Sequence, residues 1–331
     1  MLRKTLLGAL GALALMAGVA PSEASAAETI KIGTLAPKAS PWGKVFEVWS
    51  KAVGEKSGGK LEIQFFYNGS QGDEGAMVGK MKAGQLDGAA ITAVGLSKIY
   101  KPVLALQLPG ALTTWAKVDK AQEALRPEFE KGMGEAGFKL LGWGNVGRAH
   151  LMSKGYEIRT PDSLKGRKPY MWRDDEISPK LFQAIGGVTP VPLNVPEVLP
   201  NLNTGAIDAL NTSALAAEQL QWAPKLDTIT EDVTGVGIGA LVMSSKRLDA
   251  LPADLKTIMS DTGALASKAL GERIRNEDDA AFGRLKGKMK VVTWTADEKA
   301  KWESLFKQAR QKLAQGTFSA DMVSKIEGYA K

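Results

Sequence analysis

One order of structural signals occurs twice in this chain, and it restricts the possible folds more than any other feature of the sequence. Each copy contains an apolar strand, a helix that begins at Ser-Pro, a Gly-Gly pair, a second strand and a short helix that stops at a glycine. Serine is a favourable N-cap and proline fits the first helical turn, while glycine ends helices because it adopts left-handed backbone angles. The two copies predict two similar α/β lobes.

The copies can be followed in the printed sequence. The first consists of a strand at 30–35, Ser40-Pro41, Gly58-Gly59, a strand at 61–67, a helix at 74–83, Gly84 and a strand at 86–94. The second consists of a strand at 168–172, Ser178-Pro179, Gly186-Gly187, a strand at 188–193, a helix at 197–203 and Gly205. The alternative is chance similarity between two generic α/β units, because the motif Gly-x-apolar-Asp, which both copies share, is short.

Other segments predict how the lobes are connected. A helix at 115–136 and a strand at 138–143 lead toward the second lobe, the run at 236–244 leads back, and a helix at 253–286 braces both. A late strand at 291–294 and helices at 297–314 and 320–329 finish the chain. Two crossings allow a cleft to open and close about extended segments. We expect lobe I to comprise residues 27–146 and about 236–275, and lobe II about 147–235 and 276–331.

The N-terminus has the three parts of a secretory signal peptide. M-L-R-K is followed by an apolar run at 5–20 and by the small residues Ala24-Ser25-Ala26, which predicts a signal over residues 1–26 with cleavage after Ala26 or Ala27. A membrane anchor is the alternative, but it usually needs about 20 apolar residues. The chain contains no cysteine, so we expect an exported, soluble protein without a lipid anchor or disulfides.

Composition and motifs argue against nucleic-acid binding and against enzymatic catalysis. The net charge of +7 is carried by Lys and Arg residues interspersed with Asp and Glu, which indicates a solvated surface rather than a nucleic-acid site. His150 is the only histidine, G-x-S-x-G is absent, and an S-x-x-K at Ser57–Lys60 falls in a turn. We therefore expect no catalytic residue, metal site or cofactor. An exported hydrolase or lyase on a similar scaffold is the alternative.

Five segments of the chain carry a family resemblance. They read I-K-I-G-T-L-A-P-x-x-S-P-W at 30–42, S-G-G-K-L at 57–61, T-P-D-S-L-K-G-x-K at 160–168, F-Q-A-I-G-G-V-T-P-V-P-L at 182–193 and T-G-x-I-D-A at 204–209. This ordered set resembles the solute-binding proteins of tripartite ATP-independent periplasmic (TRAP) transporters. The resemblance implies a periplasmic binding protein-like α/β fold with two lobes, an interlobe cleft, hinge crossings and a long bracing helix.

The same resemblance implies a function in transport. On this basis we expect a monomeric periplasmic receptor that captures a small organic ligand. We expect it to deliver the ligand to the integral membrane subunits of a TRAP-type transporter, which an ion gradient drives. A receptor for an ATP-driven importer or for signalling is the alternative.

The resemblance also indicates which residues contact the ligand. In the family, an arginine in the strand after L-K-G commonly pairs with the ligand's carboxylate, and this chain has Tyr170 at that position. A second family arginine is approximately matched by Arg148, which alternatively pairs with a surface acid. The family's polar contact after G-x-x-D falls at Asn211 or Thr212, although Asn211 could instead cap the helix beginning near Ala214.

Aromatic residues complete the predicted site. Trp172 follows Tyr170 by two residues in a strand, so both lie on the same face, and we expect that face to line the cleft. Trp42, Trp143 and Trp222 are further candidates from other elements, with packing in the core as the alternative. Aromatic rings offer broad apolar area with a polar edge. The sequence therefore predicts a larger, aromatic or hydrophobic organic acid, bound with the help of the second arginine.

Overall fold

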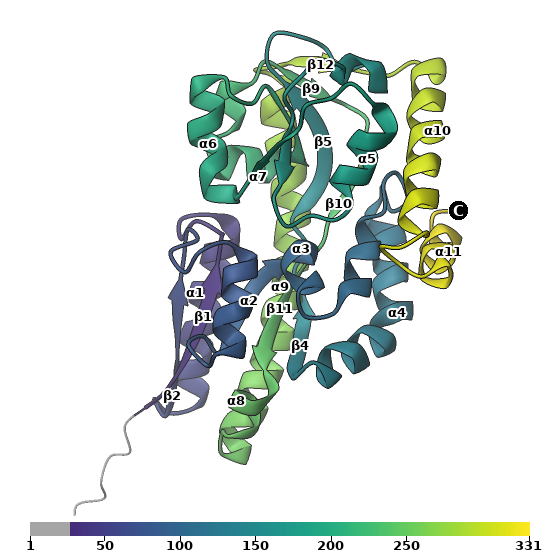
Figure 1. The fold of residues 1–331 in the computed structure, drawn as a ribbon. Coiled ribbons are helices and arrows are strands. Elements are labelled where there is room, and N and C mark those ends of the chain that lie inside the picture. Colours follow the sequence, from purple (N-terminus) through teal and green to yellow (C-terminus); the bar gives the residue numbers. More distant parts are fainter. Residues whose placement is uncertain (1–26) are drawn as a thin grey trace, which may run out of the picture.

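The computed structural model describes residues 27–331 as two lobes, one above the other in Figure 1. The signal peptide predicted for residues 1–26 lies outside the described residues. Each lobe contains a five-stranded sheet flanked by helices, which confirms the predicted α/β class with two lobes. Within residues 27–331, no helix is both long and apolar enough to cross a membrane.

The first lobe is built on the sheet with strand order β2-β1-β3-β11-β4. Its strands are β1 (Glu28–Thr34), β2 (Leu61–Phe66), β3 (Gly88–Thr92), β4 (Phe138–Trp143) and β11 (Gly239–Ser244). Its helical elements are α1 (Pro41–Lys56), α2 (Glu74–Lys82), α3 (Ala93–Ser97), η1 (Lys101–Gln107), α4 (Trp115–Glu135) and α8 (Ser245–Asp249). The strand expected at 86–94 ends earlier, because the Thr92 hydroxyl caps α3 by accepting a hydrogen bond from the Val94 N–H.

The second lobe is built on the order β10-β5-β9-β12, with β8 paired to β5, and on a two-stranded β6-β7 sheet. Its strands are β5 (Gly147–Ser153), β6 (Tyr170–Trp172), β7 (Val191–Leu193), β8 (Ala209–Ser213), β9 (Thr228–Thr230), β10 (Gly235–Gly237) and β12 (Lys290–Val292). Its helical elements include η2 (Pro161–Leu164), α5 (Ser178–Ile185), α6 (Val195–Thr204), α7 (Ala214–Gln219) and η3 (Ala223–Lys225). Helix α5 begins at Ser178, as expected, and Asp175 accepts the N–H groups of Ile177 and Ser178 at its start.

Two extended crossings join the lobes, as predicted. One runs from β4 into β5 and the other from β10 into β11. The crossings are held together by hydrogen bonds from the Gly144 N–H to the Gly239 carbonyl at 2.8 Å and from the Val146 N–H to the Gly237 carbonyl at 2.7 Å. Adjacent antiparallel segments of this kind can bend together as one hinge.

Helix α9 (Ala253–Lys286) is the bracing helix, and it runs behind both lobes in Figure 1. It packs against α1 and β4 of the first lobe and against α7 and β5 of the second. The Trp49 Nε1–H donates to the Thr262 hydroxyl at 3.0 Å, and the buried Asp278 carboxylate accepts the N–H groups of Arg148 and Leu215. Each lobe is therefore fastened to a different part of the same helix.

The two C-terminal helices belong to different lobes. Helix α10 (Ala296–Leu313) packs against α5, whereas α11 (Ala320–Tyr329) packs against α4 and η1. We expected all of residues 276–331 in the second lobe, and the position of α11 corrects that assignment for the last helix. Its buried side chains Met322, Val323 and Ile326 cover apolar residues of the first lobe. The remaining lobe boundaries stay a prediction.

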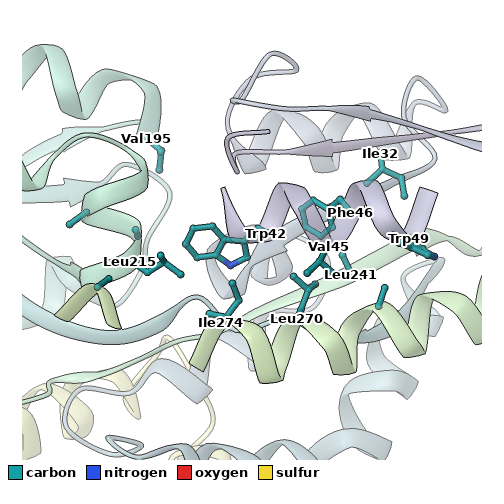
Figure 2. Close-up of a cluster of buried hydrophobic side chains, with 14 of the residues drawn as sticks. Ile32, Trp42, Val45, Phe46, Trp49, Val195, Leu215, Leu241, Leu270 and Ile274 are labelled. Atoms are coloured by element: carbon teal, nitrogen blue, oxygen red, sulfur yellow. The ribbon is translucent and has the colours of Figure 1, made fainter. Parts of the chain in front are cut away.

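The largest apolar cluster runs along the bracing helix from one lobe into the other (Figure 2). The predicted apolar stripe of α1 is buried throughout, and it consists of Trp42, Val45, Phe46, Trp49 and Val53. Figure 2 shows Trp42 at the start of α1, turned toward Leu215 on α7 and Ile274 on α9. Trp42 thus lies where the first lobe, the second lobe and the brace meet.

Candidate functional site

Two adjoining cavities of about 230 and 140 Å³ lie between the lobes. They share six lining residues, namely Thr92, Val146, Trp172, Val195, Thr212 and Trp222. Thr92 ends a strand of the first lobe, Val146 lies in a crossing, and the other four belong to the second lobe. The two cavities therefore form one interlobe cleft, at the strand ends where α/β folds bind ligands.

Tyr170 and Trp172 face this cleft from the short strand β6, as the sequence predicted. Tyr170 lines the larger cavity and Trp172 lines both. The Tyr170 ring meets Trp222 edge to face, with centroids 6.1 Å apart. The Tyr170 hydroxyl is buried and has no hydrogen-bond partner among residues 27–331, and its burial raises its pKa well above the usual value. It is a polar group that can still donate or accept one bond.

Strand β8 contributes the two predicted polar residues. Asn211 lines the larger cavity and Thr212 lines both. The Asn211 side-chain carbonyl oxygen accepts a hydrogen bond from the Thr234 hydroxyl at 2.8 Å. The amide nitrogen of the same side chain remains as a donor. Asn211 does not cap the next helix, because the Ser213 hydroxyl accepts the Ala216 N–H in that role.

The three further tryptophans divide between the cleft and the core. Trp222 is 4% exposed and lines both cavities, and Trp42 is 8% exposed and lines the smaller one. Trp143 does not line either cavity. It stacks edge to face on Phe129 of α4, with centroids 6.2 Å apart, and borders a groove between α4, β4 and α9. Trp143 therefore takes the core position that was its alternative.

Arg148 is turned away from the cleft. Successive side chains of a strand point to opposite faces, and Ala149 and Leu151 are the β5 residues that line the cavity. Arg148 instead forms an ion pair with Asp279 of α9. The structure thus places Arg148 in the alternative role, as the partner of a surface acid.

Sequence reasoning missed Asp73, which joins the two lobes across the cleft. Asp73 is the N-cap of α2 in the first lobe, and its Oδ1 accepts the Glu74 N–H at 2.8 Å. Its Oδ2 accepts the Trp172 indole N–H and the Val195 N–H, both at 3.0 Å and both from the second lobe. Aspartate is a common N-cap residue, but nothing in the sequence indicates the two donors from a distant segment.

Glu74, the next residue, is also a cleft residue that sequence reasoning missed. It is 1% exposed and lines the smaller cavity. Its carboxylate accepts the Thr92 N–H and hydroxyl, both at 2.8 Å, and the Gly95 N–H at 2.9 Å. Burial raises the pKa of Glu74 to about 8, with a smaller contribution from the Asp73 charge. Burial also raises the pKa of Asp73.

The ionisable side chains that line the cleft, apart from Tyr170, are carboxylic acids. Asp175 lines the larger cavity and Glu74 the smaller, and among the described residues no Lys, Arg or His lines either one. His150 lies on the far face of β5, where it stacks on Phe282 with centroids 4.3 Å apart and its Nδ1 contacts the Thr230 carbonyl at 2.8 Å. Within residues 27–331, no group of three His, Cys, Asp or Glu side chains is arranged to hold a metal ion.

Two α/β lobes around a closed cleft, with paired hinge crossings and a brace fastened to both, define a binding protein of the hinged, two-lobe class. Residues 32–316 match the family described as bacterial extracellular solute-binding protein, family 7. The chain belongs to this family. Its members are solute-binding proteins and not enzymes, so the expected solute-binding role is confirmed.

Relatives of known name agree with this assignment. A solute-binding protein of Chromohalobacter salexigens is 24% identical over 197 residues, which are 59% of this chain and 58% of that protein. A solute-binding protein of Verminephrobacter eiseniae is 24% identical over 278 residues, or 83% and 82%. The C4-dicarboxylate-binding periplasmic protein DctP of Vibrio cholerae is 25% identical over 217 residues, or 65% and 64%.

Solved structures share the fold. A TRAP periplasmic solute-binding protein of Shewanella oneidensis with bound succinate superposes with a TM-score of 0.86 at 18% identity, and covers 92% of this chain and 100% of that one. The sugar acid binding protein DctPAm of Advenella mimigardefordensis, in complex with galactonate, superposes with a TM-score of 0.85 at 17% identity, and covers 92% and 98%. At these identities the likeness concerns the fold alone.

Proposed function

We propose that this protein is a periplasmic receptor that encloses a small organic solute between its lobes and delivers it to a TRAP-type secondary transporter. The observation that carries the proposal is the position of Asp73. Its Oδ2 accepts two hydrogen bonds from the opposite lobe, and these can exist only while the lobes are closed over the cavities.

Ion pairs at the rim support the same closed arrangement. Lys101 lies in η1 of the first lobe and forms an ion pair of 2.6 Å with Glu176, which precedes α5 of the second lobe. Lys98 donates to the Asp174 carbonyl at 3.2 Å. Exposed pairs of this kind each contribute about 1 kcal/mol or less, so they bias the lobes toward closure and still allow a hinge to open.

We further propose a bulky, largely apolar ligand. The aromatic side chains of Trp42, Tyr170, Trp172 and Trp222 surround the two cavities, and rings of this size favour flat or hydrophobic molecules. The acid group that the sequence led us to expect has no partner at Arg148, because that guanidinium is engaged by Asp279. We therefore still expect a large, aromatic or hydrophobic ligand, but we no longer expect it to carry an acid group.

Solution scattering tests the receptor function. Native protein is isolated from the periplasm, and its small-molecule content is released by denaturation and added back to ligand-free protein. We expect the radius of gyration to fall as the lobes close. An unchanged radius at saturating extract, together with no bound compound in native mass spectrometry, would refute the receptor proposal.

Gene order tests the partner. Genes for a small and a large membrane subunit beside this one support delivery to a TRAP-type transporter. Neighbouring ATPase genes point instead to an ATP-driven importer, and genes for a sensor kinase point to signalling.

A further inference from the structure

The carboxyl groups around the cleft have no cationic counterpart among the residues that line it, and Glu74 is protonated at neutral pH because burial raises its pKa to about 8. Asp175 lines the larger cavity and Glu74 the smaller, and Asp73 lies directly behind Trp172, to which it is hydrogen-bonded. Asp175 accepts the N–H groups of Ile177 and Ser178 at 2.9 and 3.0 Å. Backbone and indole donors thus stabilise these carboxyl groups, and no side-chain cation neutralises them at the cavity wall.

Two guanidinium groups behind the residues that line the cleft, those of Arg310 and Arg148, are already paired with other acids. Arg310 lies behind the wall of the larger cavity, where its Nη1 donates to the Pro109 carbonyl at 2.6 Å, and it also bonds Glu303 and Glu327. Arg148 faces Asp279 on the other side of β5. Neither group can turn toward the cleft without leaving a carboxylate behind.

An anionic solute would therefore enter a site with no compensating charge. Its carboxylate would lose its water near Asp175 without gaining a cationic partner, and at an effective dielectric constant of about 20 the repulsion between two such charges weakens binding on the order of tenfold or more. Buried charges in proteins are paired or they neutralise. This cleft supplies no such pair.

The polar groups that remain free in the cleft suit an uncharged partner. The Tyr170 hydroxyl is buried without a hydrogen bond, and the Asn211 amide is fixed on one side by Thr234. The hydroxyl of Thr212 and the amide of Gln107 also line the larger cavity. Hydroxyl and amide groups of this kind bond carbonyl, hydroxyl and amide functions, and each such bond contributes most when it satisfies a group that is otherwise buried and unpaired.

We propose that the cleft selects a solute without an anionic group: an apolar, ring-containing body between Trp172 and Trp222, with an uncharged carbonyl, hydroxyl or amide function against Tyr170 and Asn211. This inference rests on the receptor function proposed above. It separates this chain from relatives whose structures hold succinate or galactonate, and Tyr170, in the place where the sequence resemblance leads us to expect an arginine, is its specificity-determining residue.

A matched pair of fluorescent probes tests the proposal on the mature protein. N-phenyl-1-naphthylamine is uncharged, and 8-anilinonaphthalene-1-sulfonate has the same ring system with one added anionic group. We expect the uncharged probe to bind at least about tenfold more tightly. Equal or tighter binding of the sulfonate, or no binding of the uncharged probe, would overturn the proposal.

Two variants locate the effect in the cleft. Asp175→Asn removes one negative charge and should narrow the ratio of the two dissociation constants by about threefold or more. Trp172→Ala removes both the ring and the indole N–H and should weaken binding of the uncharged probe by more than about tenfold, whereas Trp143→Phe, outside the cleft, should leave that binding unchanged. A ratio that Asp175→Asn does not move, or a probe insensitive to Trp172→Ala, contradicts the assignment.

Identification of the natural ligand distinguishes a failure of this inference from a failure of the proposed receptor function. If native mass spectrometry of protein from the periplasm finds a bound carboxylic acid that also compacts the lobes in solution scattering, the receptor function stands and the inference fails. An uncharged or cationic compound with the same effect supports both.

Discussion

Glu74 shows how a single carboxyl group can make the stability of this protein depend on pH. Its folded-state pKa is raised from 4.5 to about 8, chiefly by burial. Below pH 4.5 the group is protonated whether the chain is folded or not. Above that pH only the unfolded chain releases the proton, so the free energy of unfolding falls until about pH 8.

His150 acts in the opposite direction at lower pH. Burial lowers its pKa from 6.5 to about 4, so the unfolded chain alone gains a proton as the pH falls from 6.5 toward 4. The stability contribution of His150 is therefore lost on acidification, and between about pH 4.5 and 6.5 it opposes that of Glu74. Above pH 6.5 only the Glu74 effect of the two remains.

We therefore predict that the free energy of unfolding falls by about 2 kcal/mol between pH 6.5 and 8. Urea denaturation at several pH values measures it. Glu74→Gln removes the titrating group and keeps an acceptor for the Thr92 N–H, so the decline in this window should largely disappear. An equally steep decline in the variant would assign the effect to other groups.

Trp172 offers a second test at the scale of one residue. Trp172→Phe keeps a ring in the cleft but removes the indole N–H that Asp73 accepts from the opposite lobe. Hydrogen bonds to charged groups contribute about 1.5 to 3 kcal/mol, so the affinity for N-phenyl-1-naphthylamine should fall roughly tenfold or more. Trp143→Phe is the matched control, because the Trp143 N–H has no hydrogen-bond partner within residues 27–331. Equal losses in both variants would rule out the interlobe bond as the cause.

Some residues of the site could be predicted from the sequence and others could not. The alternation of β6 placed Tyr170 and Trp172 on one face, and the structure puts both in the cleft. The orientation of Arg148 was not predictable, because both faces of β5 are partly apolar and no pattern marks the side that meets α9. Asp73 and Glu74 were missed because their partners, from Thr92 to Val195, come from segments far away in the chain.

At the scale of elements, helices were predicted better than strands. Helix α9 was expected at 253–286 and occupies those residues, and α1 begins after Ser40 as its capping pattern indicates. The strands of the second lobe are shorter than expected: β7 spans Val191–Leu193 and not 188–193. Caps and helical periodicity are local signals, whereas a strand ends where its partner ends.

Helix α9 allows a prediction about how the brace holds the second lobe. The Asp278 carboxylate accepts the Arg148 N–H at 2.8 Å and the Leu215 N–H at 3.1 Å. Asp278→Ala leaves both buried donors unpaired and should lower the free energy of unfolding by about 2 to 4 kcal/mol. The adjacent Asp279→Asn breaks only the exposed pair with Arg148 and should cost less than about 1 kcal/mol. Urea denaturation compares them, and similar losses would contradict the anchoring role of Asp278.

For the whole molecule, the repeated sequence order predicted two lobes and the segments between the copies predicted two crossings, but neither indicated that α11 packs on the first lobe. The order of strands and helices within each copy is a local property. Helix α11 returns to the first lobe because its apolar face meets η1 and α4 there, a contact between segments about 200 residues apart in the chain. No nearby signal encodes such a contact.

The closed arrangement depends on how closely the two crossings approach each other. A Cβ atom added at Gly239 would lie 2.4 Å from the Gly144 carbonyl oxygen, whereas one added at Gly144 would meet only side-chain atoms of Leu270, with Cδ1 at 3.1 Å. Backbone cannot move aside as a flexible side chain can, so Gly239→Ala should push the crossings apart and disfavour closure. We predict that Gly239→Ala binds N-phenyl-1-naphthylamine at least about tenfold more weakly.

In solution scattering, the same variant should show little compaction when ligand is added, although circular dichroism still shows a folded protein. Gly144→Ala should change the affinity by less than about threefold, because the Leu270 side chain can shift to make room. Both glycines line the smaller cavity, so each variant adds a methyl group to the same surroundings, and the two differ in the clash between the crossings. If Gly239→Ala closes and binds as the unmodified protein does, the lobes must rotate about a point other than these paired crossings, and the hinge would have to be sought within α9.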